Sequence, residues 1–315
     1  MKGVIFSKPG YHDADGPYYT NKELADRMYK NIFYNEDIDK ELDKLDNFDY
    51  IIANINENLS NIKPLSRFGV PVLMTTGDLP KRFMDNLFKN LVSYHGVSGI
   101  IVENICMIPA FKNYLNKGDE LDYLYYPWGI DESVIKDYGE PKIYDFAQLG
   151  QFNVYQFRRE IYSLLKSNNF GINYIRFFPN RDKITSKTER PYDTYCRTIN
   201  QSKMSLGGCL QHPDYTYFRN TFMGNNFPKN IEIPGLNTLL FNTAWGDMES
   251  LGFKDGENFI QINSPRDCIR KILKYKEDLN ELERITKSGY KLVHENHTNK
   301  IHADNLIKEI ERIYK

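Results

Sequence analysis

Residues 143–150, with the sequence I-Y-D-F-A-Q-L-G, form an apolar run that ends in a glycine. Such a run is typical of a buried strand, and the glycine marks the turn after it. A helical pattern follows over 157–167, and a second apolar run covers 174–178. Strands that alternate with helices in this way predict a parallel sheet covered by helices. Further along, the sequence predicts a helix at 192–200, a strand at 204–206, a helix starting near 229, strands at 238–241 and 258–262, and helices at 265–274, 279–293 and 299–314.

The first half of the chain shows the same alternation. Its apolar runs predict strands at 3–6, 50–53, 70–74, 99–102 and 121–125, with a helix over 21–29 after the first strand. The pattern pauses at the Gly139-Glu140-Pro141 break and restarts at residue 143. We therefore predict two α/β domains, residues 1–139 and residues 140–315, because about 150 residues is an ordinary domain size.

Composition and charge exclude several classes of protein. Hydrophobic residues make up 41% of the 315 residues and charged residues 26%, which is ordinary globular usage and fits neither a disordered tail nor a coiled coil. The net charge of −1 gives no overall attraction to nucleic acid or to an anionic membrane. We find no apolar run near the ~18 residues of a membrane span, and we expect no signal peptide.

The four cysteines point to the cell compartment. Cys106, Cys196, Cys209 and Cys268 are scattered and contain no C-x-x-C pair. This spacing favours reduced thiols over a disulfide framework, so a cytoplasmic location is expected.

Three common catalytic signatures are missing. The chain has no G-x-x-x-x-G-K-S/T phosphate loop, no G-x-G-x-x-G after its first strand and no G-x-S-x-G elbow. These absences argue against an ordinary P-loop kinase or ATPase, a standard NAD domain and an α/β-hydrolase. His294, His297 and His302 do not have the H-E-x-x-H metal spacing, and we interpret them as part of a solvated C-terminal helix.

The second half contains a more specific pattern. Residues 229–241, K-N-I-E-I-P-G-L-N-T-L-L-F, resemble the R-x-x-E-I-P-A-x-G-x-L-L-L segment of CgeB-like glycosyltransferases, relatives of family 4 of the GT-B transferases. Residues 249–260, E-S-L-G-F-K-D-G-E-N-F-I, resemble the continuation of that segment. Residues 199–206 and 126–131 resemble the L-N-x-S-K-I-x-L and P-W-G-V-D segments of the same group.

This resemblance implies a fold and a reaction. The fold is GT-B, two Rossmann-like α/β domains facing across a cleft, with the last helix crossing back to the first domain. The reaction is transfer of a sugar from a nucleotide-diphosphate sugar to a hydroxyl acceptor, such as a glycan, a lipid or a protein-linked group. Kinship with family 4 implies retention of configuration. We expect no cofactor and no metal, because lysine and arginine can neutralise the phosphates. The Asp13-Ala14-Asp15 triplet matches a D-x-D metal motif but is interpreted as a polar turn.

The resemblance also assigns donor-binding residues. Glu232 is expected near the start of a helix with Pro234 in its first turn, where its carboxylate would accept hydrogen bonds from the ribose hydroxyls. Lys229 stands where the family usually has arginine, which keeps the charge but loses the bidentate fork. The remaining donor-binding candidates are Asn200, Ser202 and Lys203 at a helix-to-strand junction, and Gly150 with Arg158 after the strand at 143–150.

Catalytic candidates lie in the first domain. Residues 72–80, V-L-M-T-T-G-D-L-P, resemble a T-x-H-D turn of the family, with Gly77 where histidine is often found. Asp78 is then the candidate catalytic or acceptor-orienting carboxylate, and His95 is the second candidate.

Two alternatives remain open. A GT-B-like module that binds a nucleotide sugar or glycan without catalysis fits the departures at Gly77 and Lys229. A DNA-modifying glycosyltransferase is the other, and the net charge of −1 argues against it.

Overall fold

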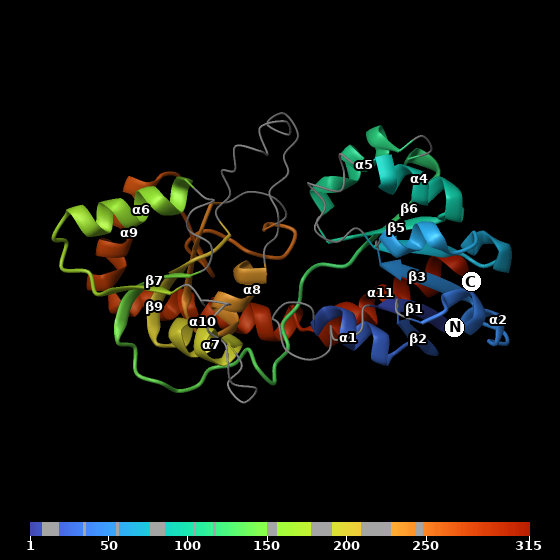
Figure 1. Cartoon of the computed structure of the whole chain (residues 1–315). Coiled ribbons are helices and arrows are strands. Elements are labelled where there is room, and N and C mark those ends of the chain that lie inside the picture. Colours follow the sequence, from blue (N-terminus) through green and yellow to red (C-terminus); the bar gives the residue numbers. More distant parts are fainter. Residues whose placement is uncertain are drawn as a thin grey trace. The chain divides into compact units, whose positions relative to one another are not determined.

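The computed structural model describes residues 1–7, 19–33, 36–54, 57–75, 86–103, 105–115, 118–149, 156–177, 191–208, 228–243 and 248–315. These residues form two compact units. The first unit comprises the described residues of 1–127 together with 299–315, and the second comprises those of 128–298 (Figure 1).

The described strands of the first unit form one parallel six-stranded sheet, with the order β2-β1-β3-β4-β5-β6. Five of them lie where the sequence predicts strands, whereas β2 was not predicted. The strands are β1 (Gly3–Ser7), β2 (Lys30–Phe33), β3 (Tyr50–Asn54), β4 (Val72–Thr75), β5 (Gly99–Val102) and β6 (Asp122–Tyr125). The helices are α1 (Tyr19–Asp26), α2 (Ile38–Asp43), α4 (Asn86–His95), α5 (Ile108–Tyr114) and α11 (Asn299–Tyr314), with 3-10 turns η1 (Glu57–Asn61), η2 (Leu65–Phe68), η3 (Ile105–Met107) and η4 (Gly118–Glu120).

The last helix, α11, belongs to the first unit although it follows the whole of the second in sequence. It lies beside α1 in Figure 1. Its apolar face contributes Ala303, Leu306 and Ile310 to the core formed with the strands and α1. Arg27 adds an ion pair, with its Nε 2.8 Å from Asp304 Oδ1. Apolar burial of this kind holds the helix in place.

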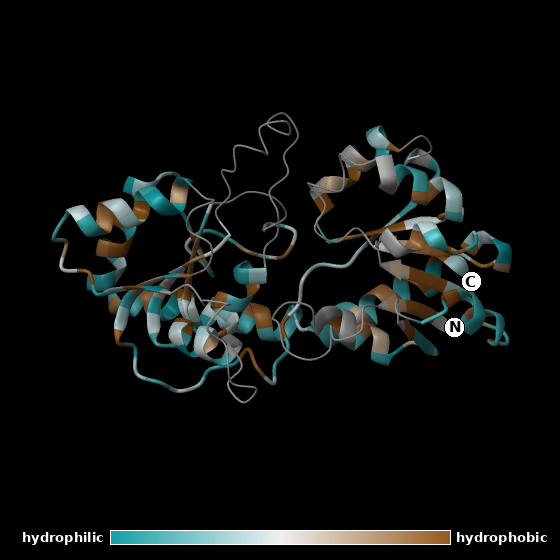
Figure 2. Ribbon diagram, viewed as in Figure 1, coloured by the Kyte–Doolittle hydropathy of each residue, from teal (hydrophilic) through white to brown (hydrophobic). Residues whose placement is uncertain are grey.

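The second unit is built on a parallel five-stranded sheet with the order β11-β10-β9-β7-β8. In Figure 2 the strands carry both hydrophobic and hydrophilic colours, whereas hydrophilic colours predominate on the outer faces of the helices. β7, β9 and β10 are nevertheless buried along most of their length, as expected for a sheet covered on both faces. The strands are β7 (Tyr144–Leu149), β8 (Tyr174–Phe177), β9 (Ser202–Leu206), β10 (Leu239–Asn242) and β11 (Ile260–Gln261). The helices are α6 (Gln156–Ser167), α7 (Pro191–Asn200), α8 (Pro228–Gly235), α9 (Pro265–Glu277) and α10 (Leu279–Asn296).

The units divide between residues 127 and 128, earlier than the division at 139/140 that the sequence suggests. The cause is that the segment after residue 127 packs on the second unit. Ile130 N donates to His297 O at 2.8 Å. The carboxylate of Asp137 accepts from Asn200 Nδ2 at 3.0 Å and from Asn237 Nδ2 at 2.7 Å. A turn signal in the sequence therefore lies inside the second unit and does not mark its boundary.

Candidate functional site

The carboxyl edge of the second sheet gathers three of the residues that the sequence singles out. All strand pairs described in this sheet are parallel, so the ends of β7, β9 and β10 lie at one edge. The helices α6 and α8 begin at that edge, because each follows one of these strands along the chain. Arg158 lies in the first turn of α6, and Lys229 and Glu232 lie on α8. Ligands of open α/β sheets bind beyond this edge.

Arg158 is a buried cation that links two strand ends. Its side chain is only 5% exposed, and its guanidinium donates to Gly207 O, just after β9, at 3.1 Å. Its own backbone carbonyl accepts from Gln148 Nε2 on β7 at 2.7 Å. The guanidinium is therefore held at a fixed position on the carboxyl edge, and its charge is largely shielded from water.

The first turn of α8 is fixed to the same edge by two side chains. Lys229 Nζ donates to Leu149 O, at the end of β7, at 2.7 Å. Asn230 Oδ1 accepts from Gly208 N, after β9, at 2.9 Å. Gly207 makes this approach possible, because a Cβ there would lie 2.7 Å from Asn230 Oδ1. The lysine charge thus lies at the end of β7, and the Asn230 amide lies at the end of β9.

Glu232 is a buried carboxylate with a defined partner. Its side chain is 6% exposed, and its Oε2 accepts from the hydroxyl of Tyr195, on α7, at 2.8 Å. Burial and the negative charge of Glu232 raise the pKa of Tyr195 well above its usual value, so the phenol stays protonated and donates. Nothing in the sequence distinguished Tyr195 from the other 22 tyrosines, because its contact spans two helices that are 37 residues apart.

One local expectation about this region is wrong. Helix α8 begins at Pro228, four residues before Glu232. Pro234 therefore lies in the last turn of the helix and not in its first. The carboxylate of Glu232 accepts a hydrogen bond from a tyrosine of another helix, α7.

Asn200, Ser202 and Lys203 lie at the opposite, amino edge of the sheet. Lys203 Nζ is 2.8 Å from Asp145 Oδ1, near the start of β7. Ser202 Oγ donates to Thr198 O at 2.8 Å, and Asn200 Nδ2 donates to Leu236 O at 2.8 Å. The strand direction separates these three residues from Arg158, Lys229 and Glu232, and the structure does not bring the two sets together.

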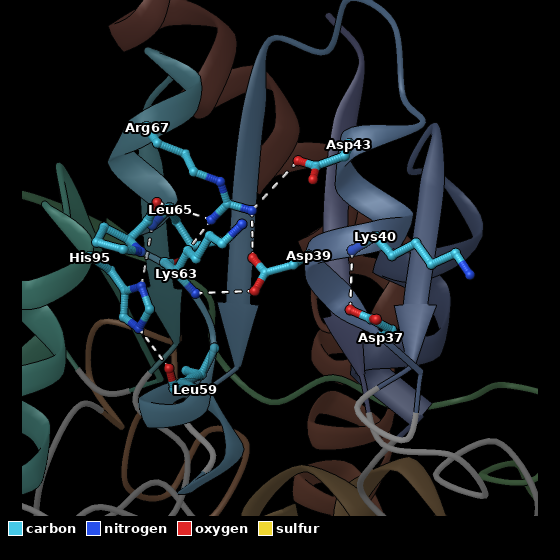
Figure 3. Close-up of polar contacts among 10 residues, drawn as sticks. Asp37, Asp39, Lys40, Asp43, Leu59, Lys63, Leu65, Arg67 and His95 are labelled. Carbon is cyan, nitrogen blue, oxygen red and sulfur yellow. Dashed lines mark hydrogen bonds and ion pairs between the residues drawn. The ribbon is translucent and has the colours of Figure 1, made fainter.

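His95 is a packing residue of the first unit (Figure 3). Its side chain is fully buried; Nδ1 accepts from Leu65 N at 3.3 Å, and Nε2 donates to Leu59 O at 2.9 Å. Burial lowers the pKa of His95, so the ring is held neutral. Both ring nitrogens are used by backbone groups, which does not fit the catalytic role expected for this residue. Asp78 and Gly150, like Asp13 and Asp15, lie outside the described residues.

The C-terminal histidines are not on a solvated helix. His297 is buried, stacks on Phe253 and donates from Nε2 to Leu251 O at 2.8 Å. The Nε2 atom of His294 lies 2.9 Å from Gly235 O. His302 is buried on α11, in the other unit. The solvated interpretation is wrong because α10 and α11 both cover cores.

A family model described as glycosyl transferase-like matches residues 153–308. The match covers most of the second unit, including Arg158, Tyr195, Lys229 and Glu232. None of the curated protein sequences compared with the chain is significantly similar to it. None of the described helices is both long and apolar enough to cross a membrane.

Solved structures identify the fold. HepE from Anabaena in complex with UDP is 10% identical over 99% of this chain and 100% of that one, with a TM-score of 0.66. Sucrose-phosphate synthase from Thermosynechococcus elongatus is 11% identical over 100% and 99% of the two chains, with a TM-score of 0.67. A DNA-modifying β-glucosyltransferase, solved with and without uridine diphosphoglucose, is 13% identical over 99% of both chains, with a TM-score of 0.59. The chain has the GT-B fold of glycosyltransferases, with two parallel-sheet α/β domains, and this prediction is confirmed.

Proposed function

We propose that this protein transfers a glycosyl group from a nucleotide-diphosphate sugar to a hydroxyl acceptor. The observation that carries the proposal is the grouping of Arg158, Lys229 and Glu232 at the carboxyl edge of the second sheet. The glycosyl transferase-like match over 153–308 and the GT-B fold support it. HepE was solved with UDP on this same fold, which favours a nucleoside diphosphate as the leaving group.

The charges of Arg158, Lys229 and Glu232 indicate which part of the donor each residue binds. Transfer leaves negative charge on the departing nucleoside diphosphate, and fixed cations that face this charge lower the barrier. Lys229 and Arg158 supply two positive charges at the edge where ligands of such sheets bind. Glu232 is assigned to the ribose hydroxyls, because a carboxylate is a strong acceptor of two neighbouring O–H donors. Asn200, Ser202, Lys203 and Pro234 have no place in this proposal, and Gly150 remains a proposed contact.

The finer features come from the CgeB-like and family 4 resemblance. They are retention of configuration, catalysis without a metal ion, and Asp78 as the catalytic or acceptor-orienting carboxylate. A cytoplasmic location fits the spacing of the four cysteines, two of which, Cys196 and Cys268, are buried thiols outside any disulfide.

Calorimetric titration and a transfer assay test the proposal together. UDP, ADP and GDP are titrated in EDTA, and the corresponding glucose donors are then followed for sugar release with and without glycan acceptors. Binding of one diphosphate and turnover in EDTA are expected. Binding without hydrolysis or transfer would identify a non-catalytic module. Activity that disappears in EDTA and returns with Mn²⁺ would instead support the metal motif at Asp13 and Asp15. No binding of any diphosphate would reject the proposal.

A further inference from the structure

The Tyr195–Glu232 pair is the feature of the second unit that the proposed function has not yet used in full. It joins α7 and α8 by one hydrogen bond of 2.8 Å between the phenol hydroxyl and Oε2. Both side chains are buried, with exposed fractions of 8% for Tyr195 and 6% for Glu232. A charged acceptor and a donor that are both withdrawn from water form a strong bond with little freedom of rotation.

Burial makes the bond necessary. A carboxylate withdrawn from water without a donor is costly, so the phenol offsets part of that cost. The same bond fixes the direction of the carboxyl plane, because Oε2 must remain in line with the hydroxyl. Two neighbouring ribose hydroxyls can be bound well only by a carboxylate that is already turned toward them, since fixing a mobile group on binding lowers affinity.

The chemistry of Tyr195 excludes a reactive role. Its pKa is raised by burial first and by Glu232 second, and Arg158 opposes this shift only in part. Cys196, its neighbour on α7, is fully buried, and burial raises the pKa of its thiol far above the usual range. Neither group is a base or a nucleophile under ordinary conditions, and the hydroxyl of Tyr195 serves as a hydrogen-bond donor.

We infer that Tyr195 is a positioning residue that orients the Glu232 carboxylate for the ribose of the donor, and so contributes to selecting ribonucleotides. This inference rests on the proposed function. Tyr195 itself acts through Glu232, so removing its hydroxyl matters only when a ribose with hydroxyls is bound.

The test compares UDP with 2′,3′-dideoxy-UDP by calorimetric titration; ADP or GDP and their dideoxy forms replace this pair if the wild type binds one of them more tightly. Tyr195→Phe should weaken UDP binding about 3- to 10-fold, the loss of one hydrogen bond. It should change binding of the dideoxy form less than about 2-fold. Tyr275→Phe is the matched control, because Tyr275 on α9 is also buried, at 6% exposed, and the charges that act on its hydroxyl are those of Lys274, Asp255 and Glu281. It should change neither affinity.

A double variant separates positioning from a general effect on structure. If Tyr195 acts only through the carboxylate, Tyr195→Phe combined with Glu232→Gln should bind UDP as weakly as Glu232→Gln alone. Thermal melts of the wild type, the two single variants and the double variant show whether each is folded. The inference would be overturned if the losses of UDP affinity in the two single variants added up in the double variant. It would also be overturned if Tyr195→Phe lost affinity equally for UDP and for its dideoxy form.

The two proposals fail in different ways. If Glu232→Gln keeps the full preference for UDP over the dideoxy form, the ribose role of Glu232 is wrong and the inference fails with it. If Glu232→Gln loses the preference and Tyr195→Phe keeps it, the proposed function stands and the inference alone is wrong. If Tyr195→Phe does not fold, the bond is purely structural and the inference is likewise rejected.

Discussion

The two edges of the second sheet contain similar residues but use them differently. The carboxyl edge has Arg158 and Lys229 with the buried carboxylate of Glu232. The amino edge has Lys142 and Lys203 with the carboxylate of Asp145. At the amino edge the opposite charges pair directly: Lys203 and Lys276 lie 2.8 Å and 3.0 Å from the two carboxylate oxygens of Asp145. At the carboxyl edge both cations donate to backbone carbonyls at strand ends.

Lys142 shows what the amino edge does. Its ammonium donates to Asn200 O at 2.6 Å and to Asn237 O at 2.5 Å, at the ends of α7 and α8. A cation at the negative end of a helix is stabilising. The amino edge is therefore a structural clamp, whereas the carboxyl edge is where a ligand with negative charge would be received. The predictions below test this division, starting with the largest effect.

Lys142→Met should lower the free energy of unfolding by about 2–4 kcal/mol, because it leaves backbone carbonyls without their charged donor. Burial lowers the pKa of Lys142 to about 8, so the ammonium is charged at pH 7, where the urea titration is done. Lys136→Met, at an exposed lysine of the same segment, is the control and should change stability by less than about 0.5 kcal/mol. Equal free energies of unfolding for the two variants would contradict the stabilising role of Lys142 at the amino edge.

Glu232→Gln should weaken binding of the nucleoside diphosphate by about 10- to 100-fold, since hydrogen bonds to a charged acceptor contribute ~1.5–3 kcal/mol. Glutamine keeps the size of the side chain and an oxygen acceptor for Tyr195, so the melting temperature should change little. Glu257→Gln, at an exposed carboxylate of the same unit, is the control for calorimetric titration. A lower melting temperature with unchanged affinity would make Glu232 a structural residue and the carboxyl edge no different from the amino edge.

His95→Gln extends the comparison to the first unit, where a buried histidine is assigned to structure. This substitution should lower the free energy of unfolding by about 1–2 kcal/mol at pH 8, because it leaves a buried hydrogen bond unmade. The wild type should also lose stability as the pH falls below about 6.5, because burial lowers the pKa of His95 and the unfolded chain then binds the proton more readily.

Urea titrations between pH 8 and pH 5 measure this loss. The dependence of the free energy of unfolding on pH should be weaker in His95→Gln than in the wild type. It should not disappear, since burial also lowers the pKa of His297. Loss of sugar transfer in a variant with unchanged stability would return His95 to the catalytic candidates.

Lys203→Ala should have the smallest effect. It breaks one partly exposed ion pair while Asp145 keeps Lys276, so stability should fall by no more than about 1 kcal/mol. Affinity for the diphosphate should stay within about 2-fold, whereas Lys229→Ala should weaken it more. If titration shows that Lys203→Ala weakens binding more than Lys229→Ala, the assignment of the two edges is reversed.

Much of the architecture could be predicted because its signals are local. The apolar run at 99–102 is a buried strand, and the run predicted at 143–150 contains the mostly buried strand β7 (Tyr144–Leu149). The helix predicted at 299–314 corresponds to α11 residue for residue. The strand β2 was missed because its four residues, K-N-I-F, include two polar side chains and lie at the edge of the sheet. Edge strands bury less surface and so leave a weaker pattern.

The sequence by itself determined the alternation of strands and helices and the presence of Lys229 and Glu232 on one helix, and its resemblance to CgeB-like glycosyltransferases implied the GT-B fold. Only the tertiary structure decided which residues share an edge. Because the strands are parallel, Lys203 lies at the edge of the sheet opposite to Glu232. Glu232 accepts a hydrogen bond from Tyr195 on another helix. His95 is buried between two backbone groups. The physical reason is that these outcomes depend on contacts between segments 30 or more residues apart, whereas sequence patterns report the preference of each segment alone.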